Sequence, residues 1–226
     1  EPPAPPAHTV EVTPDGAKVY DLAVNKAEYR SFRVRTLYEG SDDVLAGAPQ
    51  QVESVVLNDG SAQRSMVNSI TVTFGGTAIL DPGAIELRRQ NGSLVGLYAD
   101  ISILGGKTVA VLTFVGTEFV GGSLADGNYT LTVLADRVHD RWGRELDGDG
   151  DGSAGGDRAD ALFRLYGDSD GDRDVDLLDL GRFLSTFGRR QGNHHYLDYM
   201  DFDGDDRVGV IDLLAFVRRL GKDLNP

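Results

Sequence analysis

The chain has 226 residues, a formal net charge of −14 and no cysteine. Without cysteine it has no disulfides, no thiolate nucleophile and no cysteine-ligated zinc or iron–sulfur centre. No run of about 18 apolar residues occurs, so we expect no membrane insertion, and the acidic charge disfavours nucleic acid as a partner.

The N-terminal segment is rich in proline. Four of the first seven residues are proline, which favours an extended chain, so we predict a linker over residues 1–8. Because the chain begins at Glu1 and not at methionine, we expect a processed protein or a fragment. Alternation of apolar and polar residues then predicts strands over 18–24 and 29–35, and residues 40–50 are expected to form a loop.

The middle of the chain carries repeated strand patterns separated by glycine, asparagine and aspartate turns. The predicted strands are 52–57, 69–74, 84–88, 94–103, 108–114 and 129–134, and we favour a further strand over 161–166. Turns that recur at this spacing are typical of an antiparallel sandwich. We therefore predict an all-β immunoglobulin-like sandwich over residues 9–166.

Beyond residue 167 the apolar spacing changes to that of a helix. Residues 175–187 and 210–220 each carry an apolar stripe, and each stripe is followed by a glycine, Gly188 or Gly221. Glycine commonly ends a helix. We predict a small all-α domain over residues 167–226, so that the fold class of the whole chain is mixed.

A twelve-residue loop with aspartate at alternate positions begins this region. Aspartate occupies loop positions 1, 3, 5, 7, 9 and 12, namely Asp168, Asp170, Asp172, Asp174, Asp176 and Asp179. Calcium-binding loops of the EF-hand kind take oxygen ligands from the same positions, with position 7 contributing its backbone carbonyl. Six carboxylates this close repel one another without a cation, so we predict a calcium site.

A second loop of the same kind begins 33 residues later. Its predicted ligands are Asp201, Asp203, Asp205, Asp212 and the carbonyl oxygen of Arg207. A water is expected at position 9, where the residue is Gly209. An internal repeat of both the loop and the apolar helix that follows it is more specific than either loop alone.

A third acidic loop lies upstream, over residues 147–158. Its predicted ligands are Asp147, Asp149, Asp151, the carbonyl oxygen of Ser153, and Asp157, with Asp160 as the alternative closing residue. We predict a third calcium ion here, and the alternative is a flexible glycine-rich linker. All 18 acidic residues of the segment 147–226 are aspartate and its net charge is −8, so bound calcium would relieve charge repulsion.

Residues 167–223 resemble the dockerin family of cellulosomal and related surface proteins, through the two loop-plus-helix repeats described above. The resemblance implies calcium binding and a protein partner of the cohesin type. The residues that depart from the family pattern stand at loop position 6 (Arg173 and Asp206) and at positions 10 and 11 (Leu177, Leu178, Val210 and Ile211). The central region loosely resembles immunoglobulin-like modules that precede dockerin repeats in bacterial surface proteins, which implies an extracellular or cell-surface location.

We expect a calcium-binding module without catalytic activity that docks to a protein partner. Serine-hydrolase, phosphate-loop and zinc-protease motifs are absent, although paired carboxylates for glycoside cleavage stay open. One alternative is a structural cap that calcium rigidifies without a cohesin partner. Another is a carbohydrate-binding accessory region of an enzyme, with Trp142 stacking on a sugar; a packing role for Trp142 and an exposed pair at His194 and His195 are the simpler interpretations.

Overall fold

The computed structural model describes residues 7–12, 18–24, 48–116 and 119–225. The chain divides into two compact units, residues 1–47 and residues 48–226. In the first unit, β1 (Ala7–Val12) and β2 (Lys18–Val24) pair antiparallel, which confirms the strand predicted over 18–24. The predicted strand over 29–35 and most of the predicted loop over 40–50 lie outside the described residues.

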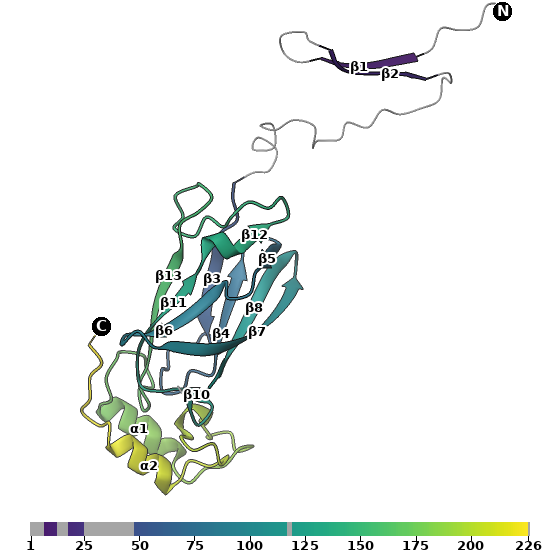
Figure 1. Cartoon of the computed structure of the whole chain (residues 1–226). Helices are drawn as coiled ribbons and strands as arrows, with labels where there is room; N and C mark the ends of the chain where they lie inside the picture. Colours follow the sequence, from purple (N-terminus) through teal and green to yellow (C-terminus); the bar gives the residue numbers. More distant parts are fainter. Residues whose placement is uncertain (1–6, 13–17, 25–47, 117–118, 226) are drawn as a thin grey trace, which may run out of the picture. The chain divides into compact units, whose positions relative to one another are not determined.

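The second unit is built on one seven-stranded antiparallel sheet with the strand order β13–β11–β6–β7–β8–β4–β3 (Figure 1). Its strands are β3 (Val52–Leu57), β4 (Ser69–Phe74), β6 (Ile85–Arg89), β7 (Leu94–Leu104), β8 (Lys107–Val115), β11 (Gly127–Val133) and β13 (Arg158–Arg164). The short pairs are β5 (Ala78–Leu80) with β12 (Val138–Asp140), and β9 (Phe119–Val120) with β10 (Ser123–Leu124). The strands predicted over 52–57 and 69–74 coincide with β3 and β4, and the other strands predicted in this unit overlap β6, β7, β8, β11 and β13.

The core of the sheet follows the alternation of its strands. In β4, Ile70, Val72 and Phe74 are fully buried, whereas the residues between them are half-buried. Leu112 of β8 and Leu131 of β11 join the same buried cluster. One face of each strand therefore packs inward, as the period of two predicts.

Strand β7 is shared by both halves of the sheet. Leu94 and Val95 pair with β6, whereas the rest of the strand pairs with β8. A Cβ on Gly96 would collide with the carbonyl oxygen of Val115, so only glycine fits where β7 changes neighbour.

The two outer strands of the sheet, β13 and β3, approach each other. The Arg158 guanidinium at the start of β13 donates to the Val52 carbonyl oxygen in β3 (3.3 Å), and the sheet is nearly closed. The predicted immunoglobulin-like sandwich is therefore wrong. The turn spacing suggested two packed sheets, but the long strand β7 pairs with both β6 and β8 and so joins the strands into one sheet.

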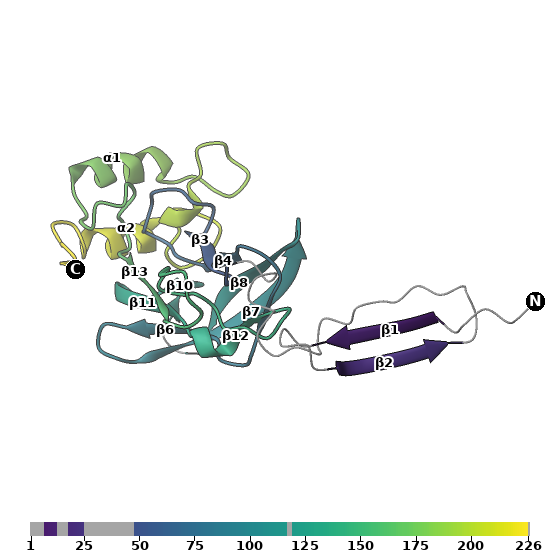
Figure 2. The same cartoon turned by 90° about the horizontal axis from the view of Figure 1, so that it is seen from above.

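Two α-helices occur among the described residues, α1 (Leu177–Thr186) and α2 (Val210–Val217), and both fall where helices were predicted. Two short 3₁₀ turns, Ala135–Arg137 and Asp198–Met200, accompany them. In both views the helices lie together at one end of the sheet (Figures 1 and 2). None of the described helices is long and apolar enough to cross a bilayer.

The predicted all-α domain over 167–226 is wrong. The helices share a buried cluster with residues of the sheet unit: Phe183 and Phe216 pack in the same cluster as Met66, Leu165 and Tyr166. They belong to the same compact unit as the sheet, and strands make up 38% of the chain whereas helices make up 14%. Helical periodicity located the helices, but it carried no information about the surface against which their buried faces pack.

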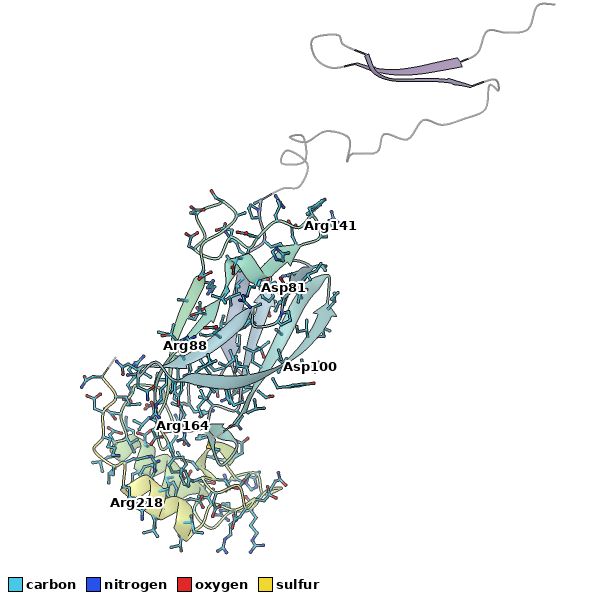
Figure 3. All side chains as sticks on the ribbon, viewed as in Figure 1. Asp81, Arg88, Asp100, Arg141, Arg164 and Arg218 are labelled. Carbon is cyan, nitrogen blue, oxygen red and sulfur yellow. The ribbon has the colours of Figure 1, made fainter. Side chains whose placement is uncertain are left out.

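Buried polar contacts join the helices to the sheet. Arg164, at the end of β13, is 1% exposed and donates to Asp126 (2.5 Å), and Arg219, beyond α2, donates to the same carboxylate (2.5 Å). The Tyr166 hydroxyl donates to the Met200 carbonyl oxygen (2.7 Å). Arg164 lies where the sheet meets the helices (Figure 3). These contacts hold the C-terminal loops and helices against the sheet.

Candidate metal sites

The first predicted loop brings three carboxylates together after β13. Oxygens of Asp168, Asp170 and Asp179 lie within 4.8 Å of one another. Asp168 is 0% exposed and Asp179 is 1% exposed. Burying carboxylates side by side is costly unless a cation or a proton neutralises them.

Backbone amides of the loop hold Asp168 in place. Its Oδ1 accepts a hydrogen bond from the Gly171 amide (2.6 Å), and its Oδ2 accepts one from the Arg173 amide (3.0 Å). Both donors have positive φ, 81° at Gly171 and 80° at Arg173. This conformation costs a residue with a Cβ roughly 1–2 kcal/mol, so the loop holds Arg173 in a strained backbone.

Asp179 ties the end of the loop to its start. Its carboxylate accepts from the Ser169 amide (2.8 Å) and from the Asp176 amide (2.9 Å). Asp176 in turn caps α1 by accepting from the Leu178 amide (2.7 Å). A ligand held by Asp179 would therefore also fix the start of α1.

The second loop repeats this arrangement. Oxygens of Asp201, Asp203 and Asp212 lie within 4.8 Å of one another. Asp201 Oδ1 accepts from the Gly204 amide (2.8 Å), three residues ahead, as Asp168 does in the first loop. The two loops thus share their folding around position 1.

Asp212 closes the second loop as Asp179 closes the first. It accepts from the Phe202 amide (2.6 Å) and from the Gly209 amide (2.5 Å), at the same two loop positions. Asp206, at position 6, has a φ of 63°, the counterpart of Arg173. The sequence repeat is therefore also a repeat of backbone geometry.

The third loop shares the first half of this arrangement. Oxygens of Asp147, Asp149 and Asp151 lie within 4.8 Å of one another. Asp147 accepts from the Gly150 amide (2.8 Å) and the Gly152 amide (3.0 Å), the same positions that serve Asp168.

Neither predicted closing residue lies in the third carboxylate group. The Asp157 carboxylate accepts from the Ala135 amide (2.8 Å). Asp160 forms an ion pair with Arg158 (2.8 Å). Position 12 of this loop is Arg158 itself, so the structure builds the third cluster from three carboxylates of one turn.

The remaining predicted ligands lie around these groups. Asp174 and Asp176 form a further group with Asp179, whereas Asp172 and Asp205 fall outside the described groups. The Ser153 amide donates to Asp151 (2.7 Å). The backbone of Arg207 forms an isolated antiparallel β-bridge with the backbone of Arg190.

The electrostatics of the loops suit a bound cation. Burial raises the pKa of Asp168 to about 6, and burial together with neighbouring carboxylates raises the pKa of Asp170 and of Asp203. Asp170 Oδ1 and Asp174 Oδ1 are buried without a hydrogen-bond partner. Carboxylate oxygens are the donors that hard divalent cations such as Ca²⁺ prefer, so these clusters could hold an ion of this kind.

Two contacts of the loops were not predicted. The Gln51 side-chain amide donates to Asp147 Oδ2 (2.5 Å) and lowers the pKa of that carboxyl, and the Tyr196 hydroxyl donates to Asp201 Oδ2 (2.7 Å). Gln51 lies 96 residues from its partner, and nothing in the local sequence marks it. Tyr196 stands in the segment between the repeats, but its spacing from Asp201 matches no loop pattern.

The helices present an exposed apolar surface beside the loops, which we call the paired-helix face. It consists of Leu177 (75% exposed), Leu178 (68%), Leu184, Val210 (64%), Ile211 (59%), Leu214 and Val217. It contains positions 10 and 11 of both loops, where the sequence departs from the dockerin pattern. Large apolar side chains this exposed are uncommon on a protein surface unless they serve binding.

Two other candidates have simpler surroundings. Trp142 is 46% exposed, and the Arg141 guanidinium lies 3.9 Å from its ring centroid, so the ring is neither a buried packing anchor nor bare for stacking on a sugar. His194 and His195 are exposed, as expected, with their ring centroids 3.8 Å apart.

No family model and no curated protein sequence matches the chain. Among solved structures, surface layer protein SbsC (domains 1–6) is 19% identical over 54% of this chain, with a TM-score of 0.33, and the match spans 14% of that protein's chain. A chain of a type II cohesin–X-dockerin complex from Acetivibrio cellulolyticus is 11% identical over 57% of this chain and 83% of its own length, with a TM-score of 0.24. Likenesses this low assign neither a fold family nor a function.

Proposed function

We propose that this chain is a calcium-binding interaction module without catalytic activity, belonging to an extracellular or cell-surface protein. The observation that carries the proposal is the repeat: two loops 33 residues apart each converge three carboxylates on one point and each lead into a helix. Duplicated acidic clusters with the same amide pattern are better explained by two ions than by two solvated turns.

Calcium would act by fixing where the helices begin. Asp179 and Asp212 stand in the first turns of α1 and α2 and also close the two loops. Three ions would change the net charge of residues 147–226 from −8 to −2. Removing this repulsion stabilises the loops and thereby the paired-helix face.

The paired-helix face would receive the protein partner. Four of its residues, Leu177, Leu178, Val210 and Ile211, stand at equivalent positions of the repeat and are more than half exposed. Aliphatic side chains held on rigid helices suit a partner with an apolar surface, and a cohesin-type domain is the partner that the dockerin resemblance implies.

Calcium dependence is tested by chelation followed with far-ultraviolet circular dichroism. We expect helical signal to fall when the chain is stripped of calcium and to return when calcium is restored. Asp170→Asn and Asp203→Asn should each weaken calcium binding at least about tenfold. Asp160→Asn is the matched control, because Asp160 is an aspartate of the same region that pairs with Arg158 outside the clusters. A helical signal that chelation leaves unchanged would contradict the mechanism.

The partner is tested separately by co-precipitation with immobilised cohesin domains. We expect a complex that forms with calcium and is lost on chelation. Leu178→Asp or Ile211→Asp should abolish this complex but leave calcium binding intact. Calcium binding without any cohesin complex would support the structural cap instead.

A further inference from the structure

The distal half of β7 exposes apolar side chains far from the calcium loops in sequence. Tyr98, Ile101, Ile103 and Leu104 are 62%, 48%, 63% and 62% exposed. Asp100 is the one charged residue of β7, and the strand contains neither lysine nor proline, the residues that usually protect a sheet edge.

This half of β7 also has a free edge. Within the described part of the chain, β7 pairs with β6 only through Leu94 and Val95, while Gly96 to Leu104 pair with β8 on the other side. The edge from Gly96 onward therefore offers backbone donors and acceptors without a neighbouring strand, again within the residues that the structure describes.

The β7–β8 turn determines which residues point their backbone groups outward. Leu104 and Lys107 flank a two-residue turn whose glycines, Gly105 and Gly106, have φ of 59° and 81°, the signature of a type I′ hairpin. The flanking residues of such a hairpin bond to each other, so even-numbered residues of β7 bond to β8. The odd-numbered residues then direct their amide and carbonyl groups to the free edge.

We propose that a second copy of this chain adds to the free edge of β7, antiparallel, with the two-fold axis at Ile101. The cross-strand pairs would be Ile101 with Ile101, Ala99 with Ile103, Tyr98 with Leu104, and Asp100 with Ser102. Each exposed apolar residue of the edge meets an apolar partner, and no like charges face each other.

Neighbouring registers are worse. An axis at Asp100 places two carboxylates opposite each other, and an axis at Ser102 places Asp100 opposite Leu104. An axis at Ala99 requires Ile103 to pair with Val95, whose edge is already taken by Leu87 of β6. The Ile101 register is the one that satisfies charge, apolar contact and free backbone together.

A cleft beside the edge fits this occupant. Its volume is about 400 Å³, and its lining includes Leu80, Ile85, Leu97, Ala99 and Ile101. The odd-numbered residues of β7 lie on the cleft side of the strand. The Ile103 side chain of the second copy, opposite the small Ala99, would therefore enter the mouth of this cleft.

The oligomeric state of the full chain tests the pairing. Sedimentation equilibrium with rising concentration should show a species of twice 24.3 kDa, and Ile101→Lys should leave only the monomer. Ile79→Lys is the matched control, since Ile79 is a 58% exposed isoleucine of β5. A chain that stays monomeric at every soluble concentration, or that binds only peptides of other proteins, overturns the proposal, as does a dimer that Ile101→Lys leaves intact.

The register is tested by disulfide formation, because the chain has no cysteine of its own. A mixture of Asp100→Cys and Ser102→Cys chains should form a crosslinked pair, since these positions face each other with Cα atoms about 4.5 Å apart. Either variant alone should not crosslink, because its two cysteines would lie roughly 8 Å apart. Crosslinking of either variant with itself, or none in the mixture, contradicts the register. Both measurements are repeated in chelator, where we expect the dimer to persist whatever the outcome for calcium.

Discussion

A comparison of the substitutions Gly171→Ala and Gly204→Ala tests how closely the first loop packs against the rest of its unit. Both glycines occupy position 4 of their loops, with φ of 81° and 71°, so alanine is strained equally in both, by roughly 1–2 kcal/mol. A Cβ on Gly171 would also collide with the Ala62 carbonyl oxygen, whereas one on Gly204 would meet open space. Overpacking of that kind adds about 1–3 kcal/mol.

We therefore expect Gly171→Ala to lower the free energy of unfolding by about 1–3 kcal/mol more than Gly204→Ala. Equilibrium unfolding in urea, with calcium present in excess, measures the difference. Equal losses would show that the first loop does not pack on the segment around Ala62, and would refute the conclusion that the helices and the sheet form one unit.

Three further predictions concern strain, protonation and the buried ion pair. Asp206→Gly should raise the free energy of unfolding by about 1 kcal/mol, because φ at this position is 63° and glycine adopts that conformation without strain. A lower free energy of unfolding, measured in urea, would contradict the strain at Asp206. In chelator-stripped protein the pKa of Asp168 is raised from 3.8 to about 6, so the folded state holds this proton more tightly than the unfolded state does. The protonated carboxyl should therefore contribute its full stabilisation below pH 4, and this stabilisation should be lost as pH rises through 6. Thermal unfolding measured across that window would show no such loss if the carboxyl were solvated. Arg164→Ala should cost about 2–3 kcal/mol, because it removes a 1% exposed guanidinium from the 25% exposed Asp126, which then keeps only Arg219 as a partner. Arg88→Ala at an exposed pair should cost about 1 kcal/mol or less, and similar costs of the two variants in urea unfolding would argue against the contact between helices and sheet.

Local patterns predicted most of the secondary structure. The alternation of Ser69 to Phe74 and the apolar stripes after Val175 depend only on residues a few positions apart, and β4, α1 and α2 formed where they indicated. The acidic spacing likewise brought Asp168, Asp170 and Asp179 together, because loop closure over twelve residues is local.

Long-range packing could not be predicted in this way. The separate all-α domain was wrong because Ser65 accepts from the Gly167 amide through its hydroxyl and from Arg164 through its carbonyl oxygen, contacts that span about a hundred residues. The two-sheet sandwich was wrong because the pairing of β7 with both neighbours depends on tertiary register. The placement of Asp157 on the Ala135 amide, away from its own loop, had the same cause.

The most direct test of calcium binding is isothermal titration calorimetry of Ca²⁺ into chelator-stripped chain. We expect saturable heat that an Asp170→Asn/Asp203→Asn double variant largely loses and that Asp160→Asn retains. A titration without heat, or with equal heat in the double variant, would contradict the assignment of these loops to calcium.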